Sequence, residues 1–424
     1  MAGRRNSYVS INKNMKIAIV GGGAAGMMCA ATIVEEHPDV EVFLIEKNNS
    51  LGKKVIISGG GRCNVTTGID DLKLVLSKYP RGNKFLQSAM HRFSPSKVFE
   101  WFENHGVELK CEEDLRVFPV SNDGHDIVAV FEKIFKNAKT NLLFKHNMKN
   151  IVKKKSKFVI SFSEGENLEV DKVVMALGGQ AYRQTGSTGD GYDILEKMGH
   201  KITDLSPSLN SFLTLEKWPK ELSGVSFEKT VIKVKGQKKY QFTGPFLFTH
   251  TGVSGPAVFA LSAMIAFEKY DRQKPLEILI DVLPDKNVEE LFVELQRLRE
   301  ESLQKTFKNT LHNFLVKSLS EKVCENLAID FEKKNVEMSK KDLRQVAEYV
   351  KALPLKIIGR GAGDEFVTAG GVELSEVDPK TMESKICSGL YFAGEILDID
   401  GFTGGFNLQA SWATGRAVGL GIVG

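Results

Sequence analysis

A glycine-rich turn between a strand and a helix constrains this chain more than any other stretch. The apolar run at residues 17–20 predicts a buried parallel strand, and Gly21, Gly23 and Gly26 follow it with the spacing G-x-G-x-x-G. In this pattern the first glycine permits a tight turn, the second lets a pyrophosphate approach the backbone, and the third lets the next helix pack closely. That helix, predicted over residues 24–36, would point its free N–H groups at the phosphates.

An acid follows this turn at the expected distance. A second apolar run, residues 40–45, ends at Glu46, about 20 residues past Gly26, where a carboxylate accepts the ribose hydroxyls of an adenine dinucleotide. The same carboxylate would repel the 2′-phosphate of NADP. A bare βαβ turn is the alternative interpretation of the glycines, but strand, helix and acid together favour a dinucleotide, either FAD or NAD.

Three adjacent glycines, residues 59–61, are followed by Arg62, Cys63 and Asn64. We expect no regular element in residues 50–66, but a loop whose backbone lies close to a ligand. Arg62 can neutralise a pyrophosphate or another anion, and Asn64 can bond the edge of a ring or a ribityl chain. The alternative is a flexible surface loop.

Two further strands are predicted to end at the nucleotide. Residues 172–177 lead into Gly178 and Gly179, and a helix that Asp190 could cap follows. Near the C-terminus a strand ends at Gly394 and Glu395, whose carboxylate would bond the ribityl hydroxyls. A glycine loop then enters a helix at residues 408–419, and the N–H groups of its first turn would lie near the flavin atoms that gain negative charge on reduction.

The chain changes character near residue 206. Residues 210–266 are rich in predicted strands, and residues 287–352 show helical periodicity with nearly balanced charges. Residues 353–356 close this insertion, and the glycines at residues 370–371 indicate a return to the first domain. His250 is a candidate for the active site, with an ordinary core or loop histidine as the alternative.

Charge and cysteine usage restrict the partners. Residues 72–99 contain six basic residues and no acid, and lysines also cluster at residues 153–157 and 229–239. These clusters are either solvated faces or a surface that meets a polyanion such as RNA. Five scattered cysteines and few histidines give no metal-ligand spacing, so we expect reduced thiols and no metal.

No apolar run is long enough to span a membrane, and the polar first 14 residues are no signal peptide. We therefore expect a cytoplasmic protein, with Met15 as a possible alternative start to Met1.

The four glycine-bearing motifs together resemble those of the bacterial flavoproteins called BaiN-like NAD(P)/FAD-dependent oxidoreductases. They lie at residues 21–26, 58–64, 176–191 and 392–407, so the resemblance covers nearly the whole chain. It implies an α/β fold, a glutathione-reductase-like FAD-binding Rossmann domain with an inserted small β-barrel and helical subdomain. The implied domains are the first part of the FAD-binding domain at residues 15–205, the barrel at 206–270 (completed by about 340–356), the helical insert at 271–339 and the second part of the FAD-binding domain at 357–424.

The resemblance also implies one set of FAD contacts, and it shows one departure, because Arg183 stands where the family has a proline. The implied contacts are Ala24, Ala25, Glu46, Lys47, Arg62, Cys63, Asn64, Gly178, Gly394, Asp400, Asn407 and Leu408. The glycine-bearing motifs and their neighbours add the predicted contacts Gly21, Gly23, Gly26, Lys54, Gly61, Val65, Gly179, Glu395, Gly405 and Phe406.

Members of the family resemble reductases of carbon–carbon double bonds. The favoured substrate is a uridine of large-subunit ribosomal RNA, reduced to dihydrouridine; the alternatives are a small steroid-like enone, or a non-catalytic flavin-bound RNA-binding or redox-sensing protein. Candidates for polarising the substrate carbonyl or supplying a proton are Cys63, His250, Arg62 and Tyr182. NAD(P)H is the expected electron donor, although there is no second G-x-G-x-x-G motif, so it would stack directly on the flavin or be replaced by another donor. The sequence leaves the oligomeric state open.

Overall fold

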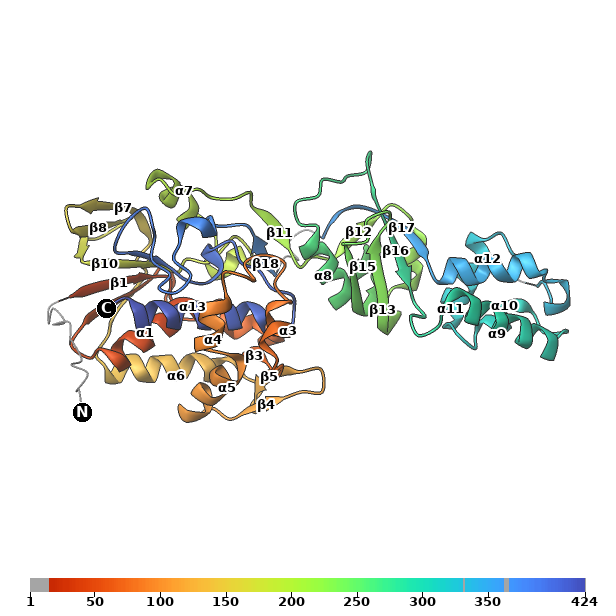
Figure 1. Ribbon diagram of the computed structural model, residues 1–424, viewed down its shortest axis with the longest axis horizontal. Helices are drawn as coiled ribbons and strands as arrows, with labels where there is room; N and C mark the ends of the chain where they lie inside the picture. The colour runs from red at the N-terminus through yellow and green to blue at the C-terminus, as the bar shows by residue number, and fades with distance from the viewer. Residues whose placement is uncertain (1–14, 331, 362–365, 424) are drawn as a thin grey trace, which may run out of the picture. The chain divides into compact units, whose positions relative to one another are not determined.

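The computed structural model describes residues 15–330, 332–361 and 366–423 (Figure 1). The chain forms two compact units: a first unit of residues 1–207 with 366–424, and a second unit of residues 208–365. The predicted breaks, at residues 206 and 357, lie near these limits. No helix of the described residues combines the length and the apolar character that crossing a bilayer requires.

A parallel five-stranded sheet organises the first unit. Its order is β19 (Leu390–Phe392), β10 (Lys172–Met175), β1 (Lys16–Val20), β2 (Glu41–Glu46) and β6 (Asn141–Phe144). The pairs β1–β10, β1–β2, β10–β19 and β2–β6 are all parallel. Residues 17–20 of β1 are all buried. This is expected for a parallel strand, because such a sheet is covered on both faces. The order places β1 at the centre, with the carboxyl ends of its neighbours at the same edge.

Two helices from opposite ends of the chain pack together beside this sheet, α1 (Ala24–Glu36) and α13 (Phe406–Gly421) (Figure 1). Small residues allow their close approach. A Cβ atom on Gly415 would lie 2.3 Å from the backbone oxygen of Ala25, and one on Gly419 would lie 2.5 Å from the Thr32 side chain. The two ends of the sequence therefore form one layer of a single unit.

The other elements of the first unit surround this core. Its remaining helices are α2 (Lys53–Ile57), α3 (Leu72–Leu76), α4 (Gln87–Arg92), α5 (Pro95–Asn104), α6 (Gly124–Asn137) and α7 (Asp190–Lys197). One small sheet has the order β3 (Thr66–Thr67), β5 (Arg116–Pro119), β4 (Leu109–Cys111), and another the order β7 (Met148–Lys154), β8 (Lys157–Phe162), β9 (Leu168–Val170). β11 (Ser206–Ser208) pairs with β18 (Val367–Ala369).

Helix capping follows the sequence in one place and departs from it in another. Ser94 accepts the N–H of Lys97 at the start of α5, with Pro95 as the first helical residue, as predicted. The predicted cap of α7 is wrong, because Gly189 occupies the N-cap position and Asp190 is already helical. The Asp190 carboxylate bonds Lys47 instead, at 2.8 Å.

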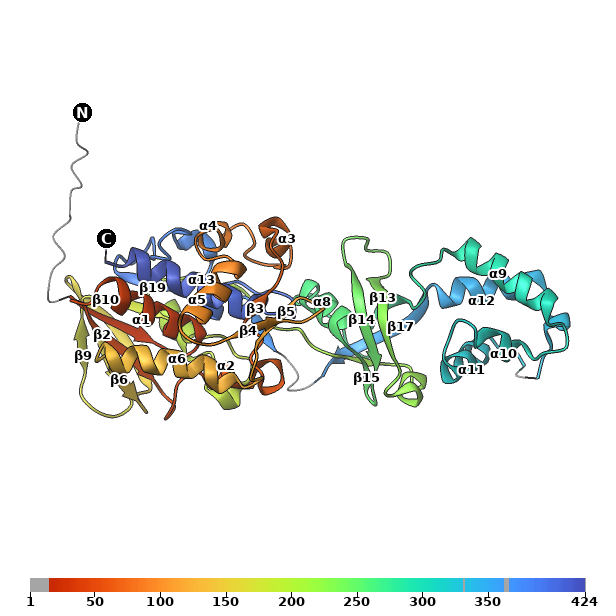
Figure 2. The same ribbon diagram turned by 90° about the horizontal axis from the view of Figure 1, so that it is seen from below.

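The second unit is a closed six-stranded barrel with helices. The barrel order is β12 (Phe212–Thr214), β15 (Gly252–Ser254), β14 (Gln241–Phe248), β13 (Ser226–Val234), β16 (Leu276–Asp281) and β17 (Leu353–Arg360). α8 (Pro256–Met264) belongs to this barrel, and Figure 2 shows α9 (Val288–Glu301), α10 (Phe307–Leu311), α11 (Lys317–Asn326) and α12 (Lys340–Val350) as a separate group of helices. A continuous core of buried apolar side chains joins barrel and helices.

The predicted boundaries inside this unit are wrong at both ends of the helical insert. β16 lies within residues 271–339, which were predicted to be helical, because Ile278 and Ile280 alternate toward the barrel core. α12 lies within the stretch predicted to complete the barrel. Its N-terminus carries a capping box of Ser339 and Asp342, and its apolar residues recur with helical period.

Candidate functional site

The glycine turn after β1 has both close packing and open space. Gly21 adopts φ +112°, and a Cβ there would lie 2.3 Å from the Ala176 oxygen; a Cβ on Gly26 would lie 1.9 Å from the Gly21 oxygen. A Cβ on Gly23 would meet no atom within 4 Å. Gly21 and Gly26 are thus required by the packing of the turn, whereas the backbone at Gly23 faces open space. α1 begins immediately afterwards, at Ala24 and Ala25, without a side-chain cap.

Glu46 at the end of β2 is buried and holds this turn. Its Oε2 atom accepts the N–H of Gly22 at 2.8 Å, and its Oε1 atom accepts the backbone N–H and the side-chain amide of Asn48 at 2.8 and 2.7 Å. The next residue, Lys47, donates to Thr188 at 2.6 Å. The carboxylate therefore has a structural role at the edge where the ribose contact is predicted, and that contact stays a prediction.

The triglycine segment differs partly from expectation. Instead of an irregular loop throughout, it contains the short helix α2 and a 3₁₀ turn at Ser58–Gly61. Gly59, Gly60 and Gly61 have φ values of +60°, +74° and +91°, which explains why glycine occupies all three positions. A Cβ on Gly60 or Gly61 would meet nothing within 4 Å. This backbone also faces open space, as a cofactor contact requires.

Arg62 and Cys63 have partners that bear on their predicted roles. The Arg62 guanidinium lies 2.7 Å from the Glu112 carboxylate and 3.8 Å from the ring centre of Phe118. The Cys63 side chain is fully buried, and burial raises its pKa to about 12, with a smaller opposing effect of its hydrogen bond to Ser58. Cys63 has no exposure even without a ligand, so its thiol is a poor candidate for touching a substrate.

Asn64 and Val65 connect the triglycine segment to the start of α13. With its amide oriented to match its neighbours, Asn64 accepts the N–H of Gly405 at 2.9 Å and donates to the Thr66 oxygen at 3.0 Å. The Val65 oxygen accepts the indole N–H of Trp412 at 3.0 Å. Two motifs separated by more than 300 residues are thereby brought into direct contact.

The turn after β10 meets the C-terminal Gly–Glu pair. Gly178 adopts φ +72°, and a Cβ on Gly179 would lie 2.8 Å from Oε1 of Glu395. Glu395 pairs with Lys54 at 2.7 Å and accepts the N–H of Thr368 at 2.9 Å. The predicted contacts Lys54, Gly179, Glu395 and Gly394 therefore lie in one neighbourhood, built from α2, the β10 turn and the segment after β19.

Tyr182, in the turn after β10, has the left-handed φ of +58°. Its ring centre is 6.0 Å from that of Phe366, and the Lys54 ammonium is 5.9 Å from it. The phenol is half-buried in the same neighbourhood as Glu395. Arg183 follows with its side chain exposed, at the start of a 3₁₀ turn.

The loop before α13 uses two predicted cofactor contacts for its own structure. Asp400 is fully buried and its carboxylate bonds the Arg81 guanidinium through two nitrogens. Asn407 accepts the N–H of Gly401 and donates to the Gly401 oxygen, both at 2.8 Å. Because these side-chain groups are engaged, any contact of Asp400 or Asn407 with a cofactor would have to share these groups or use the backbone.

The start of α13 is packed tightly but has no side-chain cap. Gly405 is its N-cap residue, at φ +89°, and a Cβ there would lie 2.2 Å from the Thr66 oxygen. Phe406 and Leu408 lie in the first turn of the helix, and the Phe406 oxygen accepts the hydroxyl of Tyr79 at 2.6 Å. The positive end of this helix is a second helix N-terminus beside the triglycine segment, since Asn64 accepts the N–H of Gly405 there.

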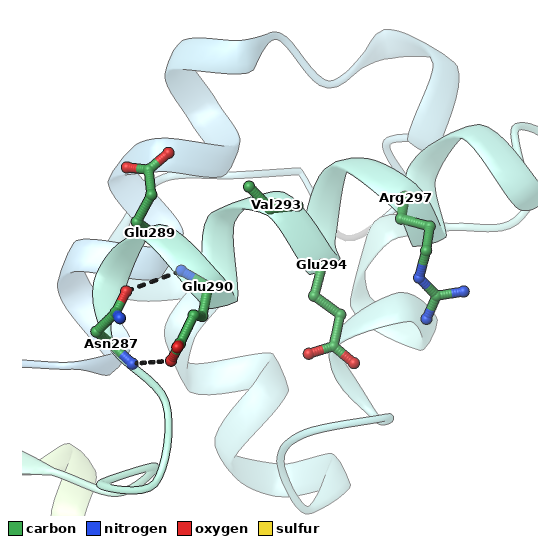
Figure 3. Close-up of a pocket in the computed structure, with 6 residues that line it drawn as sticks. All are labelled: Asn287, Glu289, Glu290, Val293, Glu294 and Arg297. Atoms are coloured by element: carbon green, nitrogen blue, oxygen red, sulfur yellow. Dashed lines mark hydrogen bonds between the residues drawn. The ribbon is translucent and has the colours of Figure 1, made fainter.

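His250 lies in the exposed turn between β14 and β15 of the second unit, as the alternative of an ordinary loop histidine predicts, and its role in catalysis stays a prediction. A hollow along α9 in the same unit is not a candidate site, because its charged groups bond one another or their neighbours (Figure 3). It is lined by Asn287, Glu289, Glu290, Val293, Glu294 and Arg297. Among the described residues no group of histidine, cysteine or acidic side chains could hold a metal ion.

The cluster in the first unit fits FAD on the ground of its own geometry. Two uncapped helix N-termini, two glycine backbones that face open space and an acid at the end of β2 suit a long dinucleotide with a pyrophosphate in its middle. Arg81, Tyr79 and Trp412, which fix the loop and helix of this site, were not predicted as site residues. Their partners are remote in sequence, and the Tyr-Pro-Arg-Gly stretch at residues 79–82 gave no recognisable signal.

Comparison with known proteins agrees with this geometry. The family model described as HI0933-like protein Rossmann domain matches residues 15–421. The 3-dehydro-bile acid delta(4,6)-reductase of Clostridium scindens is 28% identical over 411 residues, which are 95% of this chain and 98% of that protein. The ribosomal RNA dihydrouridine synthase of Haemophilus influenzae is 30% identical over 413 residues, 95% of this chain and 97% of that protein.

Among solved structures, the 3-ketosteroid delta1-dehydrogenase of Sterolibacterium denitrificans has a similar fold, with a TM-score of 0.51 and 12% identity over 97% of this chain and 99% of that one. The predicted fold class and cofactor are confirmed. The chain belongs to the HI0933-like family, and it is an FAD-dependent oxidoreductase.

Proposed function

We propose that this protein reduces an electron-poor carbon–carbon double bond, and that its substrate is a uridine of large-subunit ribosomal RNA, which becomes dihydrouridine. The names of two relatives support the bond type, since one is a delta(4,6)-reductase and the other a dihydrouridine synthase. FAD, when bound, supplies the hydride for such a reduction.

The observation that favours RNA is the position of the basic segment at residues 72–99. This segment contains no acid, and it is bonded to the loop before α13. The N–H of Phe402 donates to the Lys78 oxygen at 2.9 Å, and Arg81 pairs with Asp400 in the same loop. The exposed cations of the segment are Lys73, Lys84, Arg92 and Lys97.

Positive charge beside the predicted cofactor loop is useful for a polyanionic substrate. Neutralising phosphates with lysine and arginine releases counterions, which supplies much of the affinity of nucleic-acid binding. A steroid-like enone has no phosphates to neutralise. The segment therefore supports RNA over a small enone, and a ribosomal RNA substrate would place the protein in the cytoplasm.

The reaction also needs a group that polarises the substrate carbonyl and a donor of electrons. We assign the polarisation of the substrate carbonyl to Arg62 or Tyr182, which are half-buried. Cys63 is set aside, because its buried thiol cannot reach a substrate. A catalytic role of His250, which lies in the second unit, stays a proposal.

NAD(P)H is the proposed electron donor. Anaerobic titration of the FAD-loaded protein with NADH and with NADPH would test this, because reduction bleaches the flavin spectrum.

The decisive experiment uses ribosomal RNA from a strain that lacks the gene. Nucleoside mass spectrometry should show the loss of dihydrouridine from the large-subunit RNA, and wild-type protein should restore it. Unchanged dihydrouridine content would exclude this substrate. In the purified protein, Lys73→Glu/Lys84→Glu should lower kcat/KM for an RNA substrate about 10-fold or more, with a steep salt dependence.

A matched control places the same charge change elsewhere. Lys154 and Lys155 form the exposed tip of the β7–β8 hairpin, so Lys154→Glu/Lys155→Glu should leave RNA turnover nearly unchanged.

The second candidate substrate is a small enone, which the similarity to the bile acid reductase favours. Rapid oxidation of the reduced protein by an enone, unaffected by the Lys73 and Lys84 substitutions and by added RNA, would establish that alternative.

A further inference from the structure

We propose that His200 is a pH-sensitive latch on the edge strand β19. In its neutral form the imidazole holds the turn at residues 384–387, which precedes β19. When the ring takes up a proton, one hydrogen bond of this turn is lost, and turn and strand can open. The latch does not depend on which substrate the protein reduces.

The latch begins with a histidine that water does not reach. Of the eight histidines, all of which lie in the described residues, only His200 is buried, and its side chain is 0% exposed. Phe392 in β19 packs edge-on against it, with ring centres 5.0 Å apart. The imidazole bridges two segments. Its Nδ1 atom lies 3.1 Å from Oε2 of Glu376, and its Nε2 atom lies 3.0 Å from Oγ of Ser384.

These partners determine which ring nitrogen carries the hydrogen. The Glu376 carboxylate can only accept, and its Oε2 atom also accepts the N–H of Lys201 at 3.0 Å, so the hydrogen belongs on Nδ1. The Ser384 oxygen accepts the N–H groups of Ile386 and Cys387 at 3.1 and 2.8 Å. A hydroxyl has two lone pairs and one hydrogen, so its hydrogen is left to donate to Nε2. The neutral tautomer with hydrogen on Nδ1 therefore satisfies every one of these groups.

A second proton on the ring breaks this arrangement. It would lie on Nε2 and point at a hydroxyl whose two lone pairs already accept N–H groups, so one hydrogen bond must be lost, and water cannot replace it. Burial lowers the pKa of His200, and the hydrogen bond and charge of Glu376 raise it by less, so the net pKa shift is downward. Burial raises the pKa of Cys387 and of Tyr391, so both of these neighbours are uncharged at neutral pH.

The other charged groups of the packed segments are compensated without the ring. Lys201 pairs with Glu373 at 3.2 Å. Lys385 donates to a backbone oxygen at 2.9 Å, and Glu383 accepts a backbone N–H at 2.7 Å. Glu376 is therefore the charge that acts on the imidazole.

The latched turn is joined to a strand that can open by itself. The N–H of Ser384 bonds the oxygen of Leu390, the first residue of β19, at 2.7 Å. β19 lies at the edge of the five-stranded sheet, beside β10, so it can detach while the other strands stay paired. It leads into Gly394 and Glu395, two of the predicted FAD contacts, so its opening would extend to the predicted cofactor site.

Hydrogen exchange followed by mass spectrometry measures this opening in the purified, FAD-loaded protein. Because the folded pKa of His200 is lowered, the open form binds the proton more tightly, and acid favours opening. With an ordinary histidine pKa of about 6.5 in the open form, the opening equilibrium constant at residues 384–392 should rise about 10-fold from pH 7.5 to pH 5.5, after correction for the intrinsic exchange rate. His200→Gln should abolish this rise, because its amide can accept from Ser384 and donate to Glu376 but takes no proton.

His105→Gln is the matched control. Nδ1 of His105 lies 2.6 Å from the Trp101 oxygen, and its Nε2 atom lies 2.9 Å from the Glu35 carboxylate. Both partners accept hydrogen bonds, so a proton on this ring breaks none. The variant should keep the wild-type pH dependence of exchange at residues 384–392.

Nuclear magnetic resonance of the wild type with ¹⁵N-labelled histidine rings tests the tautomer without any variant. One of the eight ring signals should still be neutral at pH 5.5, with its hydrogen on Nδ1. The proposal is overturned if no such signal is found. It is also overturned if folded His200→Gln keeps the 10-fold rise in opening, or if the wild type shows no rise.

Discussion

Replacing Arg81 by methionine should reduce the unfolding free energy of the first unit by about 3–5 kcal/mol, the cost of leaving a buried charge without its partner. The side chain of Asp400 is 0% exposed and that of Arg81 is 15% exposed, so water cannot replace the lost guanidinium. The pair also forms a backbone bridge between residues 81 and 400. Its loss should therefore loosen the loop that leads into α13, and FAD affinity should fall as well.

Tryptophan fluorescence can isolate this effect in the first unit. Trp101 and Trp412 lie in the first unit and Trp218 in the second, so urea unfolding in a Trp218→Phe background reports on the first unit alone. Adding Asp400→Asn to Arg81→Met should recover much of the lost stability, because the buried charge is then removed. The control is Lys157→Met, which breaks an ion pair whose side chains are 49% and 59% exposed and should cost no more than about 1 kcal/mol.

Two outcomes would refute this reasoning. A loss below about 1 kcal/mol for Arg81→Met would mean that the buried pair contributes no more than an exposed one. Equal and additive losses in the two single variants and the double variant would mean that the two charges are not energetically coupled.

Four further outcomes follow from individual positions. Gly23→Ala should leave the unfolding free energy unchanged, because its Cβ would meet no atom, but should weaken FAD binding measured by fluorescence titration. Gly26→Ala should destabilise the apoprotein by about 1–3 kcal/mol, because its Cβ would lie 1.9 Å from a backbone oxygen of the same turn. Alkylation of the native protein followed by mass spectrometry should modify exposed Cys111 well before buried Cys63. The raised pKa of Asp398 means that the folded state binds its proton more tightly, so wild-type stability relative to Asp398→Asn should fall as pH rises from about 4 through the pKa of the folded state, measured by urea unfolding across pH.

The parts of the fold that follow local patterns were predictable from the sequence. The strand β1, the glycine turn and helix α1 occupy one continuous stretch, and each residue of the turn has a role that its spacing alone indicates. The cap of α5 by Ser94 belongs to the same class, since cap and helix are adjacent. In the second unit local patterns were insufficient. β16 was missed because a six-residue alternating run lies close to long helical stretches, and only closure of the barrel requires a strand there.

The partners of polar side chains could not be predicted, because they come from distant segments. Asp400 was expected to contact the cofactor, and its carboxylate bonds an arginine 319 residues earlier in the chain, so the expected contact stays a prediction. Asn64 was expected to bond the edge of a ring or a ribityl chain, and its amide bonds Gly405, Thr66 and Val117. In both cases the residue type indicated a strong hydrogen-bonding group near the cofactor loop. The type alone could not tell whether the group serves the ligand or the loop that holds it.

Whether an acid contacts the ligand or holds the loop cannot be told from its type, and the three acids of the C-terminal segment show this. Glu395, Asp398 and Asp400 are chemically similar and lie within six residues of one another, yet Lys54 and Arg81 reach only two of them as ion-pair partners within the described residues. Each cation comes from a segment that also shapes the site, α2 for Lys54 and the basic segment for Arg81. The same contacts that fix the loop therefore leave Asp398 with a buried oxygen and a raised pKa. In Asp400→Asn the guanidinium of Arg81 is freed and a neighbouring negative charge is lost, so the pKa of Asp398 should fall, and the pH range over which protonation of Asp398 changes the unfolding free energy should move to lower pH.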